Sequence, residues 1–443
     1  MKVGGQWWFH YGYYSNNMLV EKADSGKHSD RTLARQRVRT QIQFIADENL
    51  SALLNLEANS EWGRDGGKID ADVTTFVIKR AHLDWTLPNT QVQTRMGIQG
   101  IALPSVALGG HPVLNADVAA ISVSSQITPE LGLTAFWARP YDTSFDDTDA
   151  KGKQIDGKNS MDDMDLFGIM LPIKTDAVRF TPWAMFGMIG KDSGFYTDEK
   201  KNVNNFRNKE KLPAGNDVDG SSYAWWVGST FELPVLDPFF VKVDGMMGGL
   251  DTGDSDYDTF GWYVAANVGY KFSWGSLSAL GFYSSGDEDK DDRGTMPTVS
   301  SDTGGNQMTR YGLGHSPYRN HYAILSADAL GMWGVGLQLA DVSFVDNLKH
   351  TVRAFYMGGT NEGDSISRRS THSNSGNQFF GDAYLMTSDR AWEVNLLSEY
   401  TVNQYLKFNF DLAYVWLDLG DHWTDRNDTE GSFASTISVT YSF

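Results

Sequence analysis

The last stretch of the chain, Phe433–Phe443, constrains the fold more than any other segment. Apolar or aromatic side chains stand at every second position from Ile437 to Phe443, and hydroxylic side chains lie between them. A period of two predicts a β-strand with one apolar and one polar face. Chain termini usually fray into water, whereas the last strand of an outer-membrane β-barrel closes the sheet and leaves no edge in lipid. The segment therefore favours a membrane barrel over the alternative, a strand of a soluble β-sandwich.

The composition is compatible with this interpretation. The mean hydropathy of −0.38 is that of a soluble protein, but a barrel gives the same average because half of each strand faces a wet lumen. No run approaches the roughly 18 apolar residues that a membrane helix needs. The chain has no cysteine, and its net charge of −19 argues against binding to nucleic acid.

Alternating segments recur along the whole chain, and each predicts one strand. The expected strands span residues 3–14, 31–46, 50–62, 74–87, 90–100, 118–127, 131–138, 164–174, 178–190, 221–233, 238–250, 259–273, 276–286, 332–345, 348–359, 389–402, 405–418 and 433–443. Short connections alternate with long polar ones, which is typical of barrels with short periplasmic turns and long extracellular loops.

The sequence thus predicts an all-β fold with a single domain over residues 1–443. The expected architecture is a transmembrane antiparallel β-barrel of about 18 strands with both termini at the periplasmic end. Because 319–331 fits either a strand or a loop, a barrel of about 16 strands is the alternative, and a β-propeller is the soluble alternative. An outer-membrane protein is exported, so we expect the numbering to begin after a removed signal.

The segment 101–117 differs from the other long connections. It is apolar and is punctuated by Pro104, Gly109, Gly110 and Pro112. It is too apolar for a solvated loop, so we expect it to fold into the barrel and narrow the pore, leaving His111 at the opening. The alternative is a loop that packs between subunits.

The function of a pore depends on the charges at its narrowest point. Four arginines stand at spacings of two or four on the polar face of strand 31–46 and repel one another unless they face a watery pore that holds anions. Pairing about the turn 47–49 puts Arg39 opposite Glu57, and pairing about the turn 88–89 puts His82 opposite Arg95. The expected constriction comprises Arg35, Arg37, Arg39, Glu57, Glu61, Arg80, His82, Arg95 and His111. The alternative is that these charged side chains only make one face of a sheet hydrophilic and form no constriction.

Two further sets of charges need an explanation. Lys79 falls on the outward face of its strand, where a charge is costly unless it snorkels or lies in a subunit interface. Acidic clusters mark the long loops, and Asp254, Asp256 and Asp258 have a spacing that suits calcium. They lack the glycine and distal glutamate of an EF-hand, so a solvated acidic loop is the main alternative. No other cofactor is expected.

Three segments, Arg80–Thr90, Arg95–Ser105 and Leu131–Pro140, resemble the outer-membrane homotrimeric porins of sulfate-reducing bacteria of the Desulfovibrio type. The resemblance extends to the arginine-rich second strand and the terminal phenylalanine, and it implies a trimeric porin without supplying binding residues. Trimerisation would bury the apolar outer walls of the first and last strands. The other expected partners are outer-membrane lipid, lipopolysaccharide and small hydrophilic solutes.

We therefore expect a porin for passive diffusion of small hydrophilic solutes and ions, with a mild preference for anions. A sugar-selective porin is the alternative, and it predicts that aromatic side chains such as Tyr223, Trp225 and Trp226 point into the pore. An enzyme is disfavoured because the sequence contains no Gly-x-Ser-x-Gly and its histidines are scattered. A plugged transporter is disfavoured because strands begin at residue 3.

Overall fold

The structure, a computed structural model, describes residues 1–15, 30–63, 74–142, 163–190, 193, 221–253, 255, 258–288, 293–299, 309, 330–362, 385–418, 420 and 431–443. Statements about the fold concern these residues. They contain one 3-10 turn, η2 (Pro234–Leu236), and no helix with the length and apolar character needed to cross a membrane.

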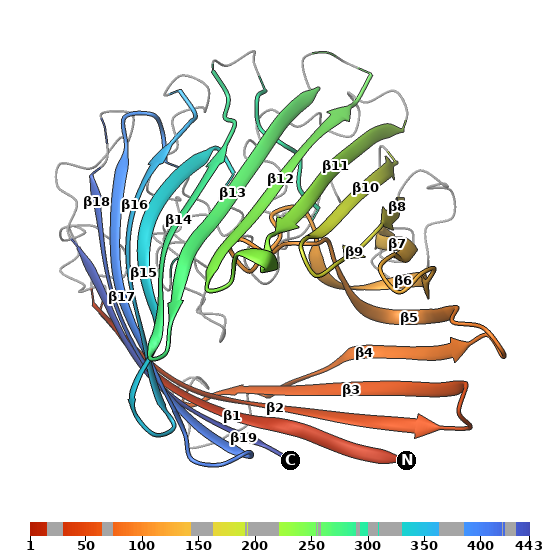
Figure 1. Ribbon diagram of the computed structural model, residues 1–443, viewed down its shortest axis with the longest axis horizontal. Coiled ribbons are helices and arrows are strands. Elements are labelled where there is room, and N and C mark those ends of the chain that lie inside the picture. Colours follow the sequence, from red (N-terminus) through yellow and green to blue (C-terminus); the bar gives the residue numbers. More distant parts are fainter. Residues whose placement is uncertain are drawn as a thin grey trace, which may run out of the picture.

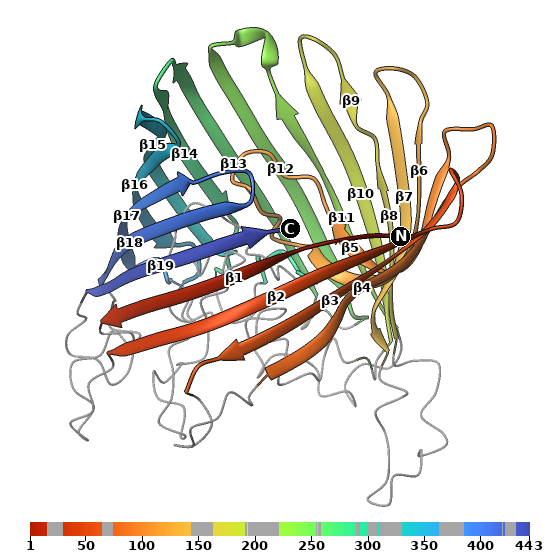
Figure 2. The same cartoon turned by 90° about the horizontal axis from the view of Figure 1, so that it is seen from below.

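The strands form one closed antiparallel barrel (Figures 1 and 2). They are β1 (Lys2–Ser15), β2 (Arg31–Ile45), β3 (Leu50–Glu61), β4 (Thr74–Thr86), β5 (Gln93–Ala102), β6 (Asn115–Gln126), β7 (Gly132–Asp142), β8 (Asp163–Met170), β9 (Ile173–Lys174), β10 (Arg179–Ile189), β11 (Ser222–Glu232), β12 (Phe239–Asp251), β13 (Thr259–Phe272), β14 (Gly275–Ser284), β15 (Met332–Val345), β16 (Leu348–Gly359), β17 (Arg390–Thr401), β18 (Leu406–Asp418) and β19 (Ser432–Ser442).

The predicted number of 18 strands is confirmed. The short β9 continues β8 after a break at Leu171 and Pro172, and both segments pair with β10, so they count as one wall strand. Proline lacks the backbone donor that an unbroken ladder needs, which accounts for the break.

The short turns lie at one end of the barrel, and side chains of turn residues hold several of them. The Asp47 carboxylate accepts hydrogen bonds from the backbone N–H groups of Asn49 and Leu50 at 2.7 and 2.9 Å. Asn403 does the same for Tyr405 and Leu406 at 2.8 and 3.0 Å. Such local bonds replace ladder bonds where the chain reverses.

The chain ends close the barrel, as the pattern of the terminal strand predicts. β1 pairs with both β2 and β19. Gly5 and Phe443 exchange backbone hydrogen bonds of 2.9 and 3.0 Å. A β-carbon at Gly5 would meet the backbone carbonyl of Arg39 on β2 and lie 2.7 Å from Cζ of Phe443, so β2 and the terminal ring leave no space for a side chain at position 5.

The interior is filled on one side. The segment between β5 and β6, orange in Figure 1, enters the barrel and lies near β12. A second segment, 293–299, lies beside it, since Val299 N–H donates to the Val113 carbonyl at 2.9 Å. Trp226 is fully buried and donates from Nε1 to the Pro297 carbonyl at 2.8 Å. These segments cover the apolar inner wall of the strands they meet, and the sequence analysis did not anticipate the contribution of 293–299.

The expected register about residues 88–89 is wrong. Asp84 faces Arg95 and His82 faces Gly97, because the chain turns over the six residues from Leu87 to Val92 and not over two. The Leu87 carbonyl accepts hydrogen bonds from both the N–H and the hydroxyl of Thr90, at 3.1 and 2.8 Å. This local bonding makes the longer turn and shifts the pairing by two residues.

Strand β4 also contains a β-bulge that the alternation did not reveal. Asn55 pairs with Arg80 and Leu56 pairs with Ile78, so Lys79 is the extra residue. A bulge breaks strict alternation of side chains along its strand. Lys79 and Arg80 consequently reach the same partner, the carboxylate of Asp117, at 2.7 and 2.6 Å.

Substitution of Gly5 tests how closely the ends are fitted. We expect Gly5→Val to lower the free energy of unfolding by about 1–3 kcal/mol, because the added side chain meets the Arg39 backbone carbonyl of β2 and the Phe443 ring. Gly245→Val on β12 is the matched control, since nothing lies within 4 Å of a β-carbon there. Denaturant unfolding of both variants in detergent measures the difference; equal stability of the two would contradict the tight closure.

Candidate pore constriction

The loop 103–114 is held inside the barrel by one carboxylate. Asp244, on the inner face of β12 and 2% exposed, accepts hydrogen bonds from Ser105 Oγ at 2.8 Å, Val106 N–H at 2.9 Å and Ala107 N–H at 3.0 Å. Asn267 Nδ2 on β13 donates to the Ala107 carbonyl at 3.3 Å. The loop starts from β5 and is fixed to β12 and β13, so it narrows the lumen.

His111 belongs to this loop but is buried and does not lie at the opening where it was expected. Its side chain is 1% exposed and meets the Trp183 ring edge to face at 5.1 Å. Its Nδ1 accepts a hydrogen bond from the Val113 N–H at 3.1 Å. Burial lowers the pKa of His111 to about 3, so the ring is neutral at physiological pH and serves packing.

The arginines of β2 face the lumen together with the inner residues of β1 and β3. Arg39 lies opposite Glu57, as predicted, and the same register puts Arg35 opposite Glu61. Arg39 forms an ion pair with Glu57, which also accepts a 2.7 Å hydrogen bond from Asn59.

The sequence analysis did not foresee the part that Trp8 plays in this wall. The guanidinium carbons of Arg35 and Arg37 lie 5.2 and 5.3 Å from the centroid of the Trp8 ring. Trp8 pairs with Arg37 across β1 and β2, so the ring lies beside the arginine column. A cation over an indole face is attracted by its quadrupole, which helps to hold two like charges near one another.

A second charged pair lies on β4 and β5. Arg95 binds Asp84 through two hydrogen bonds of 2.6 and 3.1 Å. His82 is close to the same carboxylate, with Nε2 3.7 Å from Oδ2 of Asp84, and its Nδ1 is 3.3 Å from the Ile98 carbonyl. Arg95 and His82 therefore stand on the wall next to the arginine column, and Asp84 neutralises one charge there.

Arg80 is turned away from the other arginines. Its ion partner, Asp117 on β6, pairs with Gly100 on β5. Gly100 and Ile98 share one face of β5, whereas the buried Gln99 lies on the opposite face. A β-carbon at Gly100 would lie 2.6 Å from Nη2 of Arg80, so the guanidinium lies over Gly100. Of the sequence-predicted set, Arg80 thus extends from its pairing position opposite Asn55 toward Asp117 on β6, away from the arginine column.

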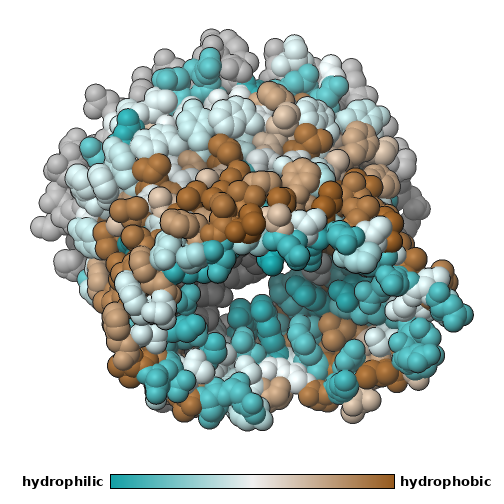
Figure 3. Space-filling view, in the orientation of Figure 1, coloured by the Kyte–Doolittle hydropathy of each residue, from teal (hydrophilic) through white to brown (hydrophobic). Residues whose placement is uncertain are grey.

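The wall of β2 to β5 brings charged side chains to the remaining opening, whereas the loop 103–114 brings none. Figure 3 shows a gap through the molecule with hydrophilic residues along its lower border. On β2 to β5 the lumen-facing arginines are Arg35, Arg37, Arg39 and Arg95, and the carboxylates beside them are Glu57, Glu61 and Asp84. The loop 103–114 contains no carboxylate or basic side chain apart from the neutral His111. An anion in the opening therefore meets attraction on one side and no repelling charge on the loop.

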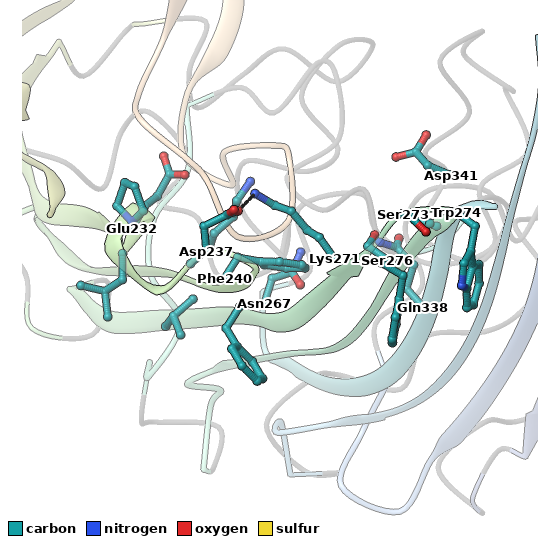
Figure 4. Close-up of a pocket in the computed structure, with 18 of the residues that line it drawn as sticks. Glu232, Asp237, Phe240, Asn267, Lys271, Ser273, Trp274, Ser276, Gln338 and Asp341 are labelled. Atoms are coloured by element: carbon teal, nitrogen blue, oxygen red, sulfur yellow. Dashed lines mark hydrogen bonds and ion pairs between the residues drawn. The ribbon is translucent and has the colours of Figure 1, made fainter. Parts of the chain in front are cut away.

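Below the loop, a cavity of about 920 Å³ opens at the turn end of β11 to β16 (Figure 4). Phe240, Asn267 and Gln338 line it, and Lys271 forms a 2.8 Å ion pair with Asp237. Asn267 also binds the loop, so the cavity begins where the constriction ends.

The aromatic residues that would mark a sugar path do not line the pore. Tyr223 and Trp225 are 45% and 39% exposed and share the outer face of β11 with Val227. Trp226 is buried beneath residues 293–299. The three therefore form no aromatic path along the lumen.

The possible calcium site falls mostly outside the described residues. Asp254 and Asp256 are not described, and Asp258 accepts hydrogen bonds from the N–H and hydroxyl of Thr252 at 2.7 and 3.1 Å. Among the residues that the structure does describe, no group of acidic, histidine or cysteine side chains could hold a metal ion.

Comparisons with known proteins agree with the fold. No protein-family model matches the sequence, and no curated protein matches it. Solved structures do match along the whole chain: OccAB3 of Acinetobacter baumannii has 11% identity and a TM-score of 0.57 over 100% of this chain and 99% of that one. A BenF-like porin from Pseudomonas fluorescens Pf-5 has 12% identity and a TM-score of 0.55 over 100% and 99%. OpdQ of Pseudomonas aeruginosa has 12% identity and a TM-score of 0.53, over 100% of this chain and 97% of that one. At these identities the likeness concerns the fold, which is the barrel of outer-membrane porins.

Substitution of Asp244 tests the anchoring of the loop. We expect Asp244→Ala to leave three donors without an acceptor and to weaken loop docking by about 1–3 kcal/mol. Single-channel recording should then show larger and noisier currents. Asp346→Ala in the exposed turn between β15 and β16 removes the same charge away from the loop and should record like the wild type. If the currents of Asp244→Ala were as small and as quiet as those of the wild type, the loop would have another anchor.

Proposed function

We propose that this protein is an outer-membrane porin through which small hydrophilic solutes and ions diffuse passively, with a mild preference for anions. One observation carries the proposal: a column of lumen-facing arginines stands opposite an inward loop without carboxylates. Field lines concentrate in a narrow opening between low-dielectric walls, so the charges there outweigh the overall negative charge of the chain.

The porin fold of the solved structures supports the class of function. The BenF-like protein bears the name porin, and its barrel covers the whole of this chain. We assign the protein to the outer membrane because an open, water-filled barrel with an apolar outer wall suits that bilayer. The proposed diffusion requires no catalytic group and no cofactor, and calcium at the loop of Asp254, Asp256 and Asp258 stays a prediction.

Homotrimeric assembly is part of the proposal and rests on sequence. The segments Arg80–Thr90, Arg95–Ser105 and Leu131–Pro140 are similar to trimeric porins of the Desulfovibrio type. Outer-membrane lipid and lipopolysaccharide are the other expected partners of the barrel wall.

The selectivity of the constriction can be tested by removing two of its charges. We expect Arg37→Ala/Arg39→Ala to lower the anion-to-cation permeability ratio by about two- to fivefold, because two positive charges that face the lumen are lost. Lumen positions change selectivity more than stability, so the barrel should still fold. The reversal potential across a planar bilayer with a potassium chloride gradient gives the ratio.

A control variant removes the same charge elsewhere. Lys2 and Lys174 are exposed and lie at the turn end of the barrel. At about 0.1 M salt, the electrostatic potential of a charge is screened over about 10 Å, so these lysines have little influence on ions at the constriction. Lys2→Ala/Lys174→Ala should therefore leave the reversal potential nearly unchanged. An equal shift in both double variants would mean that net charge, and not the constriction, sets the selectivity.

A further inference from the structure

The cavity at the turn end of β11 to β16 has the size of a site for a small solute. Its volume is about 920 Å³, and sites for small molecules commonly measure about 300–1,000 Å³. Asn267 lines the cavity and also donates to the Ala107 carbonyl of the loop 103–114 at 3.3 Å. A solute that passes beside the loop is therefore next to the cavity.

Basic side chains outnumber carboxylates among the described residues that line the cavity. The basic residues are Arg179, Lys242, Lys271 and Lys349, and the carboxylates are Glu232, Asp237 and Asp341. Lys271 lies 2.8 Å from Asp237, and Lys349 lies 3.5 Å from Asp341. Glu232 stands between two basic residues, since it pairs with Arg179 on β10 and with Lys242 on β12. The lining thus has one positive charge in excess and favours an anion.

Lys242 is the basic residue placed to hold that anion. It is half-buried on the inner face of β12, two residues before the loop anchor Asp244. Its ammonium group has no ion pair within the part of the chain that the structure describes. A carboxylate that reaches this ammonium group accepts a charge-assisted hydrogen bond, which is stronger than a bond between neutral groups.

An apolar surface lies next to Lys242. Phe240 stands two residues away on the same face of β12 and lines the cavity. A β-carbon at Gly269 on β13 would lie 2.5 Å from Cζ of Phe240, so the ring lies across the inner face of β13. Figure 4 shows Phe240 beside Asn267 in the cavity. A solute whose carboxylate reaches Lys242 can therefore place an apolar body on the Phe240 ring.

Gln338 supplies a donor on the far side of the cavity. Its Oε1 accepts a hydrogen bond from Nε of Arg353, which can only donate. The Nε2 group of Gln338 consequently points away from Arg353, and it has no partner among the described residues. Adjacent strands lie about 4.8 Å apart, so the backbones of Lys242 on β12 and Gln338 on β15 are about 14 Å from one another. The cavity therefore has room for several carbon atoms behind a carboxylate at Lys242.

We propose that this cavity binds small organic anions that have an apolar body, with the carboxylate at Lys242 and the body on Phe240. The inference rests on the porin function proposed above, because the pore delivers the solute, and it names a class of solute that the channel retains. Chloride and acetate make only the contact with Lys242, so they pass without being retained.

Block of the single-channel current by hexanoate tests the site. Hexanoate carries one carboxylate and a short apolar chain, and it should reduce the current of the wild-type channel in potassium chloride in a saturable way. Acetate lacks the apolar chain and should need about a tenfold higher concentration for the same block. Hexylammonium has the same chain with the opposite charge and should not block.

Two variants separate the two contacts. Lys242→Met keeps an unbranched side chain without the charge and should raise the half-blocking concentration of hexanoate about tenfold. Phe240→Ala should raise it about fivefold for hexanoate and leave that of acetate unchanged. Lys2→Met, at the turn end but outside the cavity, is the control and should be blocked like the wild type. Equal block of the wild type and Lys242→Met, or block by hexylammonium at the same concentration as by hexanoate, would overturn the site.

Isothermal titration of hexanoate into the protein in detergent measures the site without conduction. The wild type should bind hexanoate, and Lys242→Met should bind it about tenfold more weakly. A wild type that conducts potassium chloride but shows neither block nor binding would refute the site and leave the porin function standing. Binding that is lost in Lys242→Met, from a protein that forms no channels, would support the site and refute the porin function.

Discussion

The structure depends on one requirement: backbone polar groups inside a membrane must find partners within the protein. The exchange of hydrogen bonds between Gly5 and Phe443 closes the ladder at 2.9 and 3.0 Å and removes the edge that an open sheet would present to lipid. The outer face of the terminal strand is apolar, as expected of a wall strand that faces lipid.

Closure of the wall also determines how the pore is shaped. A barrel of this circumference has room for chain inside it, and the loop 103–114 and residues 293–299 occupy that room. Because Asp244 takes its hydrogen bonds from the loop, its negative charge is buried in the anchor and does not face the pore. The free side of the opening is left to the arginines of β2 and to Trp8, which lies against two of them.

Strands were predictable from sequence because a period of two survives wherever one face of a strand is wet and the other apolar. The register of Arg39 and Glu57 was also predictable, since Asp47 marks a tight turn beside them. The register of His82 was not, because Thr90 lengthens its turn. Nor were the positions of His111 and Arg80, which depend on contacts with Trp183 and Asp117, residues distant in the chain. Alternation describes a regular strand, so it does not reveal a bulge such as that at Lys79.

The central claim is that local charge at the constriction, and not the net charge of −19, decides which ions pass. The sign of the reversal potential of the wild-type channel in a gradient of potassium chloride tests it most directly, because potassium and chloride ions diffuse almost equally fast in water. The account predicts the sign of an anion-preferring channel, and a larger potential at low salt, where screening is weaker. A cation-preferring sign that grows at low salt would contradict it and would assign selectivity to the acidic loops.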